Sequence, residues 1–326
     1  MSNPTPPVGP GLPETQTMVS DTVTAPAPHR QGKHKQAKGG KPASLWTDAW
    51  YDLRRRPMFI LSVVIILILL VMSFWPQLFT SVDPFNARTC DLSTARQGPS
   101  AGHLFGRDNL GCDVYARTIY GARNSIVIGV LTTIITTLVG GLFGIIAGYK
   151  SGLVDSVSSR LTEVFFAIPP ILGALLIAAT FRGRANSILL VIIALAVLGW
   201  PMTYRIMRAA VITAKSQDFV VAARALGAGA GRIMFRHLLP NSVAPVIVVA
   251  TINLGGFIAA EAALSFLGVG VLSPDISWGL MIADARDRFL EAPLPLIFPA
   301  VFLCVTVLAF IMMGDAVRDA LDPKLR

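Results

Sequence analysis

Two carboxylates, Glu163 and Glu261, fall inside long hydrophobic stretches of this 326-residue chain. A charged side chain costs free energy in hydrocarbon, so an acidic residue in such a stretch is a candidate for handling a substrate or a proton. The alternative is that each pairs within a helix bundle or reaches a wet edge. We favour this alternative, because neither has an obvious acidic or histidine relay partner. By polarity alone, Thr251, Asn253 and Glu261 are candidates for lining a pathway.

Motifs for catalysis are absent from the sequence. It has no G-x-x-x-x-G-K-[ST] loop for ATP, no H-E-x-x-H and no G-x-S-x-G. The four histidines are scattered, so we expect no metal site, no cofactor and no enzymatic activity of the chain itself. Cys90 and Cys112 share one polar loop. A disulfide between them and two free thiols are both open, because distance cannot be deduced from sequence.

The segment from Val221 to Asn241, VAARALGAGAGRIMFRHLLPN, lies between two hydrophobic stretches. Asp218 can cap a short helix that ends at Gly227, a residue suited to a left-handed stop. A second helix is expected over about residues 232–239, ending against Pro240. The segment therefore predicts two short helices joined by glycines.

Small or apolar residues are expected on one face of the first short helix, where they permit close contact: Ala222, Ala223 and Leu226. Three arginines beside them can meet acidic groups or lipid phosphates: Arg224, Arg232 and Arg236. The segment is thus typical of a cytoplasmic docking element. An ordinary basic loop, whose charges only fix topology, is the alternative.

The elements that must position these residues are membrane helices. The chain is 53% hydrophobic and only 14% charged, against about a quarter charged in soluble domains. Its apolar residues gather in runs of about 20, long enough to cross a bilayer. Six spans are predicted: Met58–Trp75, 125–149, 161–180, 187–204, 243–267 and 294–313. The pair Pro169 and Pro170 should kink or unwind the third.

Positive charge predicts the orientation of these spans. With both termini in the cytoplasm, inside segments hold 19 of the 28 Lys and Arg residues, including the triplet Arg54, Arg55 and Arg56. The net charge of +9 is explained in this way. We expect no nucleic-acid partner, because no basic motif interleaved with aromatics is present. The tail over residues 1–43 has no apolar face and is predicted to be disordered.

Glycines recur at four-residue spacing in the second span, at Gly140, Gly144 and Gly148. In a membrane such spacing lets two helices approach closely through their backbones. It predicts a tightly packed helix bundle, which a channel, a transporter or a membrane enzyme could equally use.

The basic segment resembles the cytoplasmic EAA loop of permease subunits of ATP-binding-cassette importers, with its central glycine at Gly227 and an I-x-x-x-x-L-P-like end at Ile233–Pro240. Val221 stands where that family usually has Glu, and Cys112 where it tends to have Arg. Other matching motifs resemble the C-type permease of dipeptide and oligopeptide importers: HLFGRDNLGCDVYARTIYGARNSIVIGV, AGYKSGLVDS, AEAALSFLGVGV, SWGLMIADARD and GDAVRDALDPKLR.

The resemblance implies an all-α, six-span type I importer permease in a bacterial membrane. It implies a sister permease, two ATPase subunits, an extracytoplasmic binding protein and a peptide substrate, although relatives also handle glutathione, haem or nickel complexes. The tail over residues 1–43 falls outside the resemblance. The rest of the chain divides into the first span and outer loop, 44–123, a transporter domain, 124–314, with its coupling loop at 217–241, and a cytoplasmic end, 315–326. An ion-driven transporter would need matched discontinuous helices in both halves. Only one proline-broken span is visible.

Overall fold

The structure is a computed structural model that describes residues 50–51, 53–86 and 89–321. They belong to one compact unit, residues 43–326. The tail predicted over residues 1–43 lies outside the described residues. The described residues form helices, turns and two isolated β-bridges, with no strand among them. The predicted fold class, an all-helical polytopic membrane protein, is confirmed.

Five helices are long and apolar enough to cross a membrane: α2 (Pro57–Phe74), α3 (Val114–Lys150), α6 (Ser187–Lys215), α10 (Ala244–Phe266) and α12 (Leu294–Leu321). Their centres agree with the predicted spans, but three are longer. Helix α3 begins 11 residues before the predicted span, and α6 and α12 continue well past their predicted ends. The hydrophobic runs stop where charged residues begin, whereas the helices continue because polar residues are good helix formers outside hydrocarbon.

The predicted third span consists of two helices, α4 (Gly152–Ala167) and α5 (Pro170–Thr180), which meet at 84°. The break lies at Pro169 and Pro170, as the sequence predicts. Ile168 precedes the first proline and is extended, with φ −89° and ψ 120°, because a proline ring disfavours the helical conformation of the residue before it. If the bent pair counts as one span, the described part of the chain has six.

Helices α3 and α6 touch through their backbones at the three spaced glycines. A Cβ atom on Gly140 would lie 2.5 Å from the Trp200 carbonyl oxygen, and one on Gly144 would lie 2.8 Å from that of Tyr204. On Gly148 it would lie 2.9 Å from a methyl of Val211. The two helices can therefore be this close only where α3 lacks side chains.

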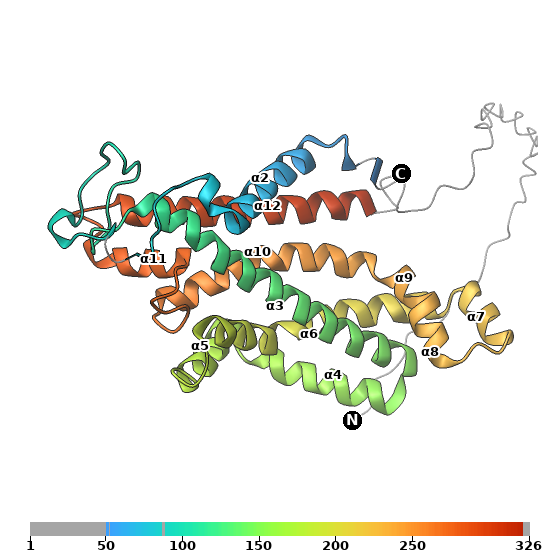
Figure 1. Cartoon of the computed structure of the whole chain (residues 1–326). Coiled ribbons are helices and arrows are strands. Elements are labelled where there is room, and N and C mark those ends of the chain that lie inside the picture. The colour runs from blue at the N-terminus through green and yellow to red at the C-terminus, as the bar shows by residue number, and fades with distance from the viewer. Residues whose placement is uncertain (1–49, 52, 87–88, 322–326) are drawn as a thin grey trace, which may run out of the picture. The chain divides into compact units, whose positions relative to one another are not determined.

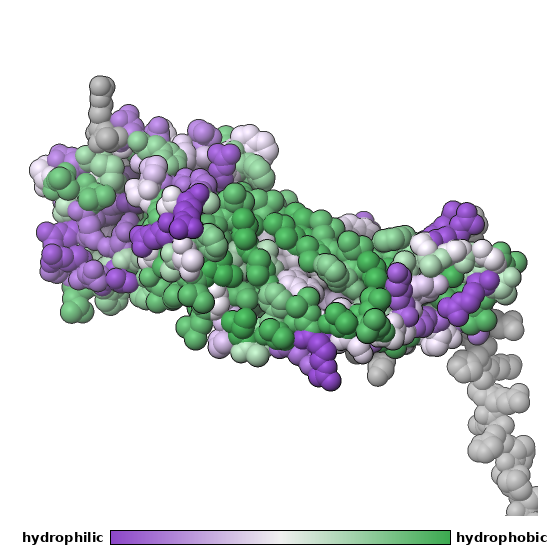
Figure 2. Space-filling model, turned by 90° about the horizontal axis from the view of Figure 1, so that it is seen from below, coloured by the Kyte–Doolittle hydropathy of each residue, from purple (hydrophilic) through white to green (hydrophobic). Residues whose placement is uncertain are grey.

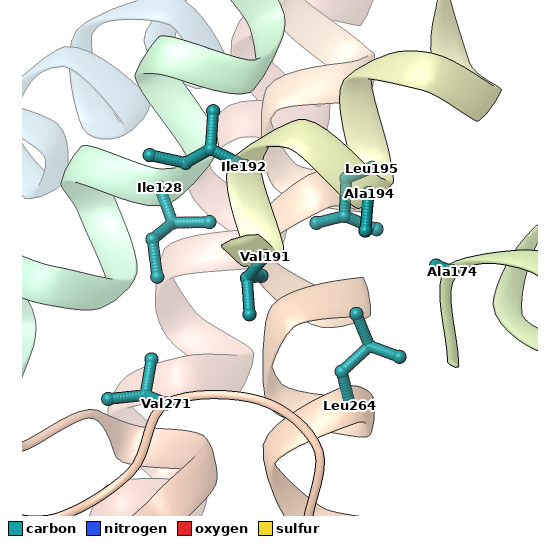
Figure 3. Packing of buried hydrophobic residues seen from close by; sticks show 8 residues of the cluster. All are labelled: Ile128, Ala174, Val191, Ile192, Ala194, Leu195, Leu264 and Val271. Carbon is teal, nitrogen blue, oxygen red and sulfur yellow. The ribbon is translucent and has the colours of Figure 1, made fainter. Parts of the chain in front are cut away.

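A buried apolar cluster joins α3, α5, α6, α10 and the loop after α10 (Figure 3). Its members are Ile128, Ala174, Val191, Ile192, Ala194, Leu195, Leu264 and Val271. Within a membrane such side chains are stabilised by close van der Waals packing rather than by removal from water. The cluster fixes the bent α5 against α6 and so determines the inner wall of the bundle.

The bundle has two ends, seen in Figure 1. One, called the α7 end, carries α7 (Asp218–Ala225), α8 (Ala230–Arg232) and α9 (Leu239–Ser242). The other, called the α11 end, carries α11 (Trp278–Ala285) and the loop over residues 89–113. Figure 2 shows a hydrophobic band between two hydrophilic ends. This pattern is that of a protein whose middle lies in hydrocarbon.

Candidate functional site

Helix α7 has Gln217 at its N-cap position and Asp218 as its first residue. The prediction that Asp218 caps the helix is therefore wrong, and no side chain bonds the cap. The Asp218 carboxylate lies in the first turn, where it still favours the positive end of the helix dipole. Gly227 follows the helix with φ +77°, the left-handed conformation that its position predicts.

The two faces of α7 differ. Val220 is fully buried and Ala223 nearly so, whereas Leu226 is 88% exposed. Ala222 is also exposed. The prediction that Ala222, Ala223 and Leu226 share one face is wrong, because Ala223 is turned into the bundle while Ala222 and Leu226, four residues apart, lie on the exposed side. Together with Val221, which is 57% exposed, the outer face presents apolar surface beyond the hydrophobic band.

The second short helix does not end against Pro240. Helical structure continues from α8 through a π-helical turn, η4 (Ile233–Leu238), into α9, which contains Pro240. A proline lacks the N–H that an α-helix uses and crowds the preceding turn. The widened π turn directly before it gives the ring room.

The three arginines of this segment, Arg224, Arg232 and Arg236, are exposed. None of them forms an ion pair with a residue in the described part of the chain. The outer surface of the α7 end is therefore apolar and positive together.

The inner side of the segment is fixed to the bundle. Val220 packs in a buried cluster with Ile145 of α3, Met207 and Val211 of α6, and Leu238. At the end of α6, the Lys215 ammonium donates to the Tyr149 carbonyl, 3.0 Å away, which caps the end of α3. A displacement of α7 must therefore act on both long helices.

Arg208 of α6 binds Asp155 of α4 through two hydrogen bonds, one of them 2.7 Å long between Nη2 and Oδ2. Paired guanidinium–carboxylate contacts of this kind are the strong ones. They connect α6 to the first half of the broken span. No local sequence pattern predicts this pair, because its members lie 53 residues apart.

A cavity of about 530 Å³ opens between α4, α5, α6 and α10. Asn253 lies in its wall, among mostly apolar side chains. Thr251 does not line it, and its hydroxyl donates to the Ile247 carbonyl at 2.9 Å. The full lining is Phe165, Phe166, Ile168, Pro170, Ile171, Leu195, Leu198, Gly199, Met202, Asn253, Gly256, Phe257 and Ala260.

Glu261 does not line the cavity either. It is fully buried, and its carboxylate accepts hydrogen bonds from Ser125 of α3 at 3.1 Å, Ser265 of α10 at 2.8 Å and Ser277 at 2.8 Å. Ser277 in turn caps α11. The structure thus favours pairing of Glu261 within the bundle over a place in the pathway. Glu163, by contrast, is exposed and lies 2.8 Å from Arg160.

Charged side chains gather at the α11 end. Arg117 donates to Asp108, and it lies 3.7 Å from the Asp284 carboxylate. Burial raises the pKa of the Asp284 carboxyl above its usual value, and the positive Arg117 partly opposes that shift. Nearby, His103 Nδ1 lies 2.5 Å from the carboxylate of Asp113, which caps α3. Arg117 comes from the first turn of α3, Asp284 from α11 and the others from the loop before α3, so only the contact with Asp284 joins distant parts of the sequence.

The sulfur atoms of Cys90 and Cys112 are bonded in the structure, with Cα atoms 4.1 Å apart. The bond closes the loop over residues 90–112 directly before α3. Cys112 is buried, and its backbone N–H donates to Asp108. The loop is therefore fixed to the start of α3 by both contacts.

The class that these features define is a polytopic helical membrane protein with a cavity between its helices. The chain belongs to the family of binding-protein-dependent transport system inner membrane components, whose model matches residues 140–326. Residues 44–99 match the N-terminal transmembrane domain of oligopeptide transport permease C. These matches confirm the resemblance seen in the sequence, and they make the chain a multi-pass inner-membrane protein.

Curated relatives cover nearly the whole chain. It is 36% identical to the oligopeptide transport system permease protein OppC of Bacillus subtilis, over 88% of this chain and 92% of that one. It is 38% identical to the dipeptide permease DppC of Bacillus subtilis, over 91% and 92%. It is 35% identical to the glutathione permease GsiD of Pectobacterium atrosepticum, over 86% and 92%.

Proposed function

We propose that this chain is the permease subunit of an ATP-driven importer for dipeptides or oligopeptides. It forms half of a translocation pathway with a sister permease, and two separate ATPase subunits hydrolyse the ATP. An extracytoplasmic binding protein delivers the substrate. The relatives named for dipeptides and oligopeptides support the peptide substrate. The glutathione permease at 35% identity makes glutathione, itself a small peptide, the second candidate.

One observation carries this proposal: the α7 end presents an apolar, positive outer face whose inner side is packed on α3 and α6. An exposed side chain such as Leu226 is unfavourable in water and is suited to a partner's groove. Burying it fully would contribute about 1.5–3 kcal/mol, which is roughly a tenfold to hundredfold gain in affinity. The partner that fits is an ATPase subunit, because the chain has no ATP motif of its own.

The contacts suggest how the ATPase acts on the pathway. Closure of the ATPase pair would displace α7, and Val220 would pass that displacement to α3 and α6. The Arg208–Asp155 pair would carry it to α4, one wall of the cavity. The cavity would then open alternately to the two sides of the membrane.

The α7 end is the cytoplasmic end in this proposal, and both termini are cytoplasmic. The arginine triplet before α2 supports this orientation, because positive residues stay inside. Arg56 also lies 2.7 Å from Asp319 near the end of α12, so these two helix ends lie at the same side.

A charge placed on the outer face of α7 tests the docking role. In the assembled importer, we expect Leu226→Glu to reduce ATP-driven peptide uptake at least tenfold, because the charge opposes burial in an apolar groove. The ATPase subunits should also co-purify poorly with this variant. Uptake is measured with a radiolabelled tripeptide in proteoliposomes.

The matched control is Leu290→Glu, since Leu290 is 96% exposed but lies near the α11 end. It should leave ATPase recovery unchanged, because it lies at the other end of the bundle from α7. A second variant, Gly227→Pro, forces φ near −65° where the backbone has +77°. If Leu226→Glu and Gly227→Pro both retain uptake, the docking role is wrong.

A further inference from the structure

Two hollows adjoin each other along α4 and α6. The apolar cavity of about 530 Å³ includes Phe166 and Met202 in its wall. A polar hollow of about 360 Å³ is lined by other residues of the same two helices: Ser159, Thr162, Glu163, Tyr204, Arg205 and Arg208. Arg205 stands at the boundary, because its guanidinium carbon lies 4.4 Å from the centroid of the Phe166 ring.

Charge in the polar hollow is balanced at every ionic side chain except Arg205. Glu163 is paired with Arg160 at 2.8 Å, and Arg208 is held by Asp155. Arg205 is exposed, and no residue in the described part of the chain forms an ion pair with it. The hollow therefore presents one unpaired positive charge beside an apolar wall.

The contact with Phe166 stabilises this charge only partly. A cation over an aromatic ring gains about 0.5–2 kcal/mol, whereas a hydrogen bond to a charged group contributes about 1.5–3 kcal/mol. The same contact places the guanidinium beside Phe166, which lines the cavity. A planar guanidinium binds a carboxylate through two parallel hydrogen bonds, so an anion of this shape complements it best.

We propose that Arg205 binds the free carboxylate of the transported peptide as the peptide leaves the apolar cavity toward the α7 end. This inference rests on the proposed function and names the substrate class: peptides with an unblocked C-terminus or an acidic side chain. Apolar side chains would occupy the wall of Phe165, Phe166 and Phe257, and the Asn253 amide can hydrogen-bond a peptide group. Arg205 is a specificity residue at this site.

Direct titration of the assembled importer without nucleotide and without its binding protein tests the site. The probes are fluorescent Ala-Phe-Ala and its C-terminal amide. We expect wild type to bind the free acid at least tenfold more tightly than the amide, because a charge-assisted hydrogen bond contributes about 1.5–3 kcal/mol. Arg205→Met should abolish the difference, and Arg205→Lys should keep part of it, since it keeps the charge but loses the planar fork.

The matched control is Arg184→Met, an exposed arginine in the turn between α5 and α6. It should keep the preference for the acid. Equal affinities of wild type for acid and amide, or a preference that survives in Arg205→Met, would overturn the inference and leave a lipid phosphate or a sister-subunit carboxylate as the partner of Arg205.

Uptake of both peptides by the wild-type complex with ATP and its binding protein is measured separately. If the complex takes up peptide but the titration shows no preference for the free acid, only the role of Arg205 is overturned. Absence of all peptide uptake contradicts the proposed function, and this inference fails with it.

Discussion

Glu261 shows how a buried carboxylate can be fully satisfied by neutral groups. Each of its three serine partners donates to it and also accepts a backbone N–H: Ser125 from Trp278 at 3.2 Å, Ser265 from Val271 at 3.0 Å and Ser277 from Leu280 at 3.1 Å. The carboxylate thus connects α3, α10 and the start of α11. Its role is to position α11, because its two oxygens accept from three hydroxyls that are oriented by their own backbone partners.

The stability of Glu261 variants should depend on how many hydrogen bonds the new side chain can accept. Glu261→Ala leaves three buried hydroxyls without their acceptor, so we expect it to lower the free energy of unfolding by about 3 kcal/mol or more. Glu261→Gln keeps one acceptor oxygen and the shape, and should cost about 1 kcal/mol. Thermal unfolding of the purified protein measures both. Glu163→Gln, at an exposed residue, is the control. If it lowers the free energy of unfolding as much as Glu261→Ala does, the structural role of Glu261 is wrong.

For single residues, the sequence shows which side chains are unusual but does not show what they do. Glu261 is conspicuous because it is charged within a hydrophobic stretch, but its partners are 136 and 16 residues away as well as four. Serines are too common for such a pattern to be recognised. Arg205 and Arg208 lie about one helical turn apart in the sequence. This spacing indicates a polar face on α6, although it was not among the predicted features.

Helices α3 and α6 owe their contact to the absence of side chains. The four-residue spacing of Gly140, Gly144 and Gly148 predicts a close helix approach, and the structure has α6 as the neighbour at all three. The identity of the partner helix could not be predicted, because a glycine face only indicates that something lies near. Hydrophobic runs likewise predict where helices cross the membrane but not where they end.

Gly144→Ala should destabilise this helix pair. The added methyl would lie 2.8 Å from both the Tyr204 carbonyl oxygen and the Met207 Cβ, so backbone must move. Overpacking of this kind costs about 1–3 kcal/mol. The matched control is Gly256→Ala in α10, where a Cβ would meet nothing within 4 Å. Thermal unfolding of the two variants compares them, and equal stability would show that α3 and α6 can separate without cost.

For the whole molecule, the orientation and the Cys90–Cys112 bond can be tested together in a Cys304→Ala background. In intact cells, an impermeant maleimide should label neither Cys90 nor Cys112. After an impermeant reductant is added, the maleimide should label at least Cys90, which is the more exposed of the two. A Leu226→Cys variant should not label in intact cells, because the α7 end is cytoplasmic in the proposed orientation. Mass spectrometry of the labelled protein measures each outcome.

Two results would contradict the whole-molecule picture. Labelling of Leu226→Cys in intact cells would reverse the orientation, and labelling of Cys90 without a reductant would exclude the disulfide. The composition predicts a membrane protein and the charge asymmetry predicts its direction, whereas the arrangement of loop, disulfide and α11 depends on contacts between distant parts of the chain.

The length of α3 has a mechanical consequence. With 37 residues it is about 55 Å long, against about 30 Å for the hydrocarbon core of a bilayer. A substantial part of it, stiffened by contact with α6, must project beyond the lipid. The pair would then behave as a rigid lever pivoting in the membrane. A displacement of a few ångströms applied to its free end would rotate the cavity wall, so force can be transmitted without bending any helix.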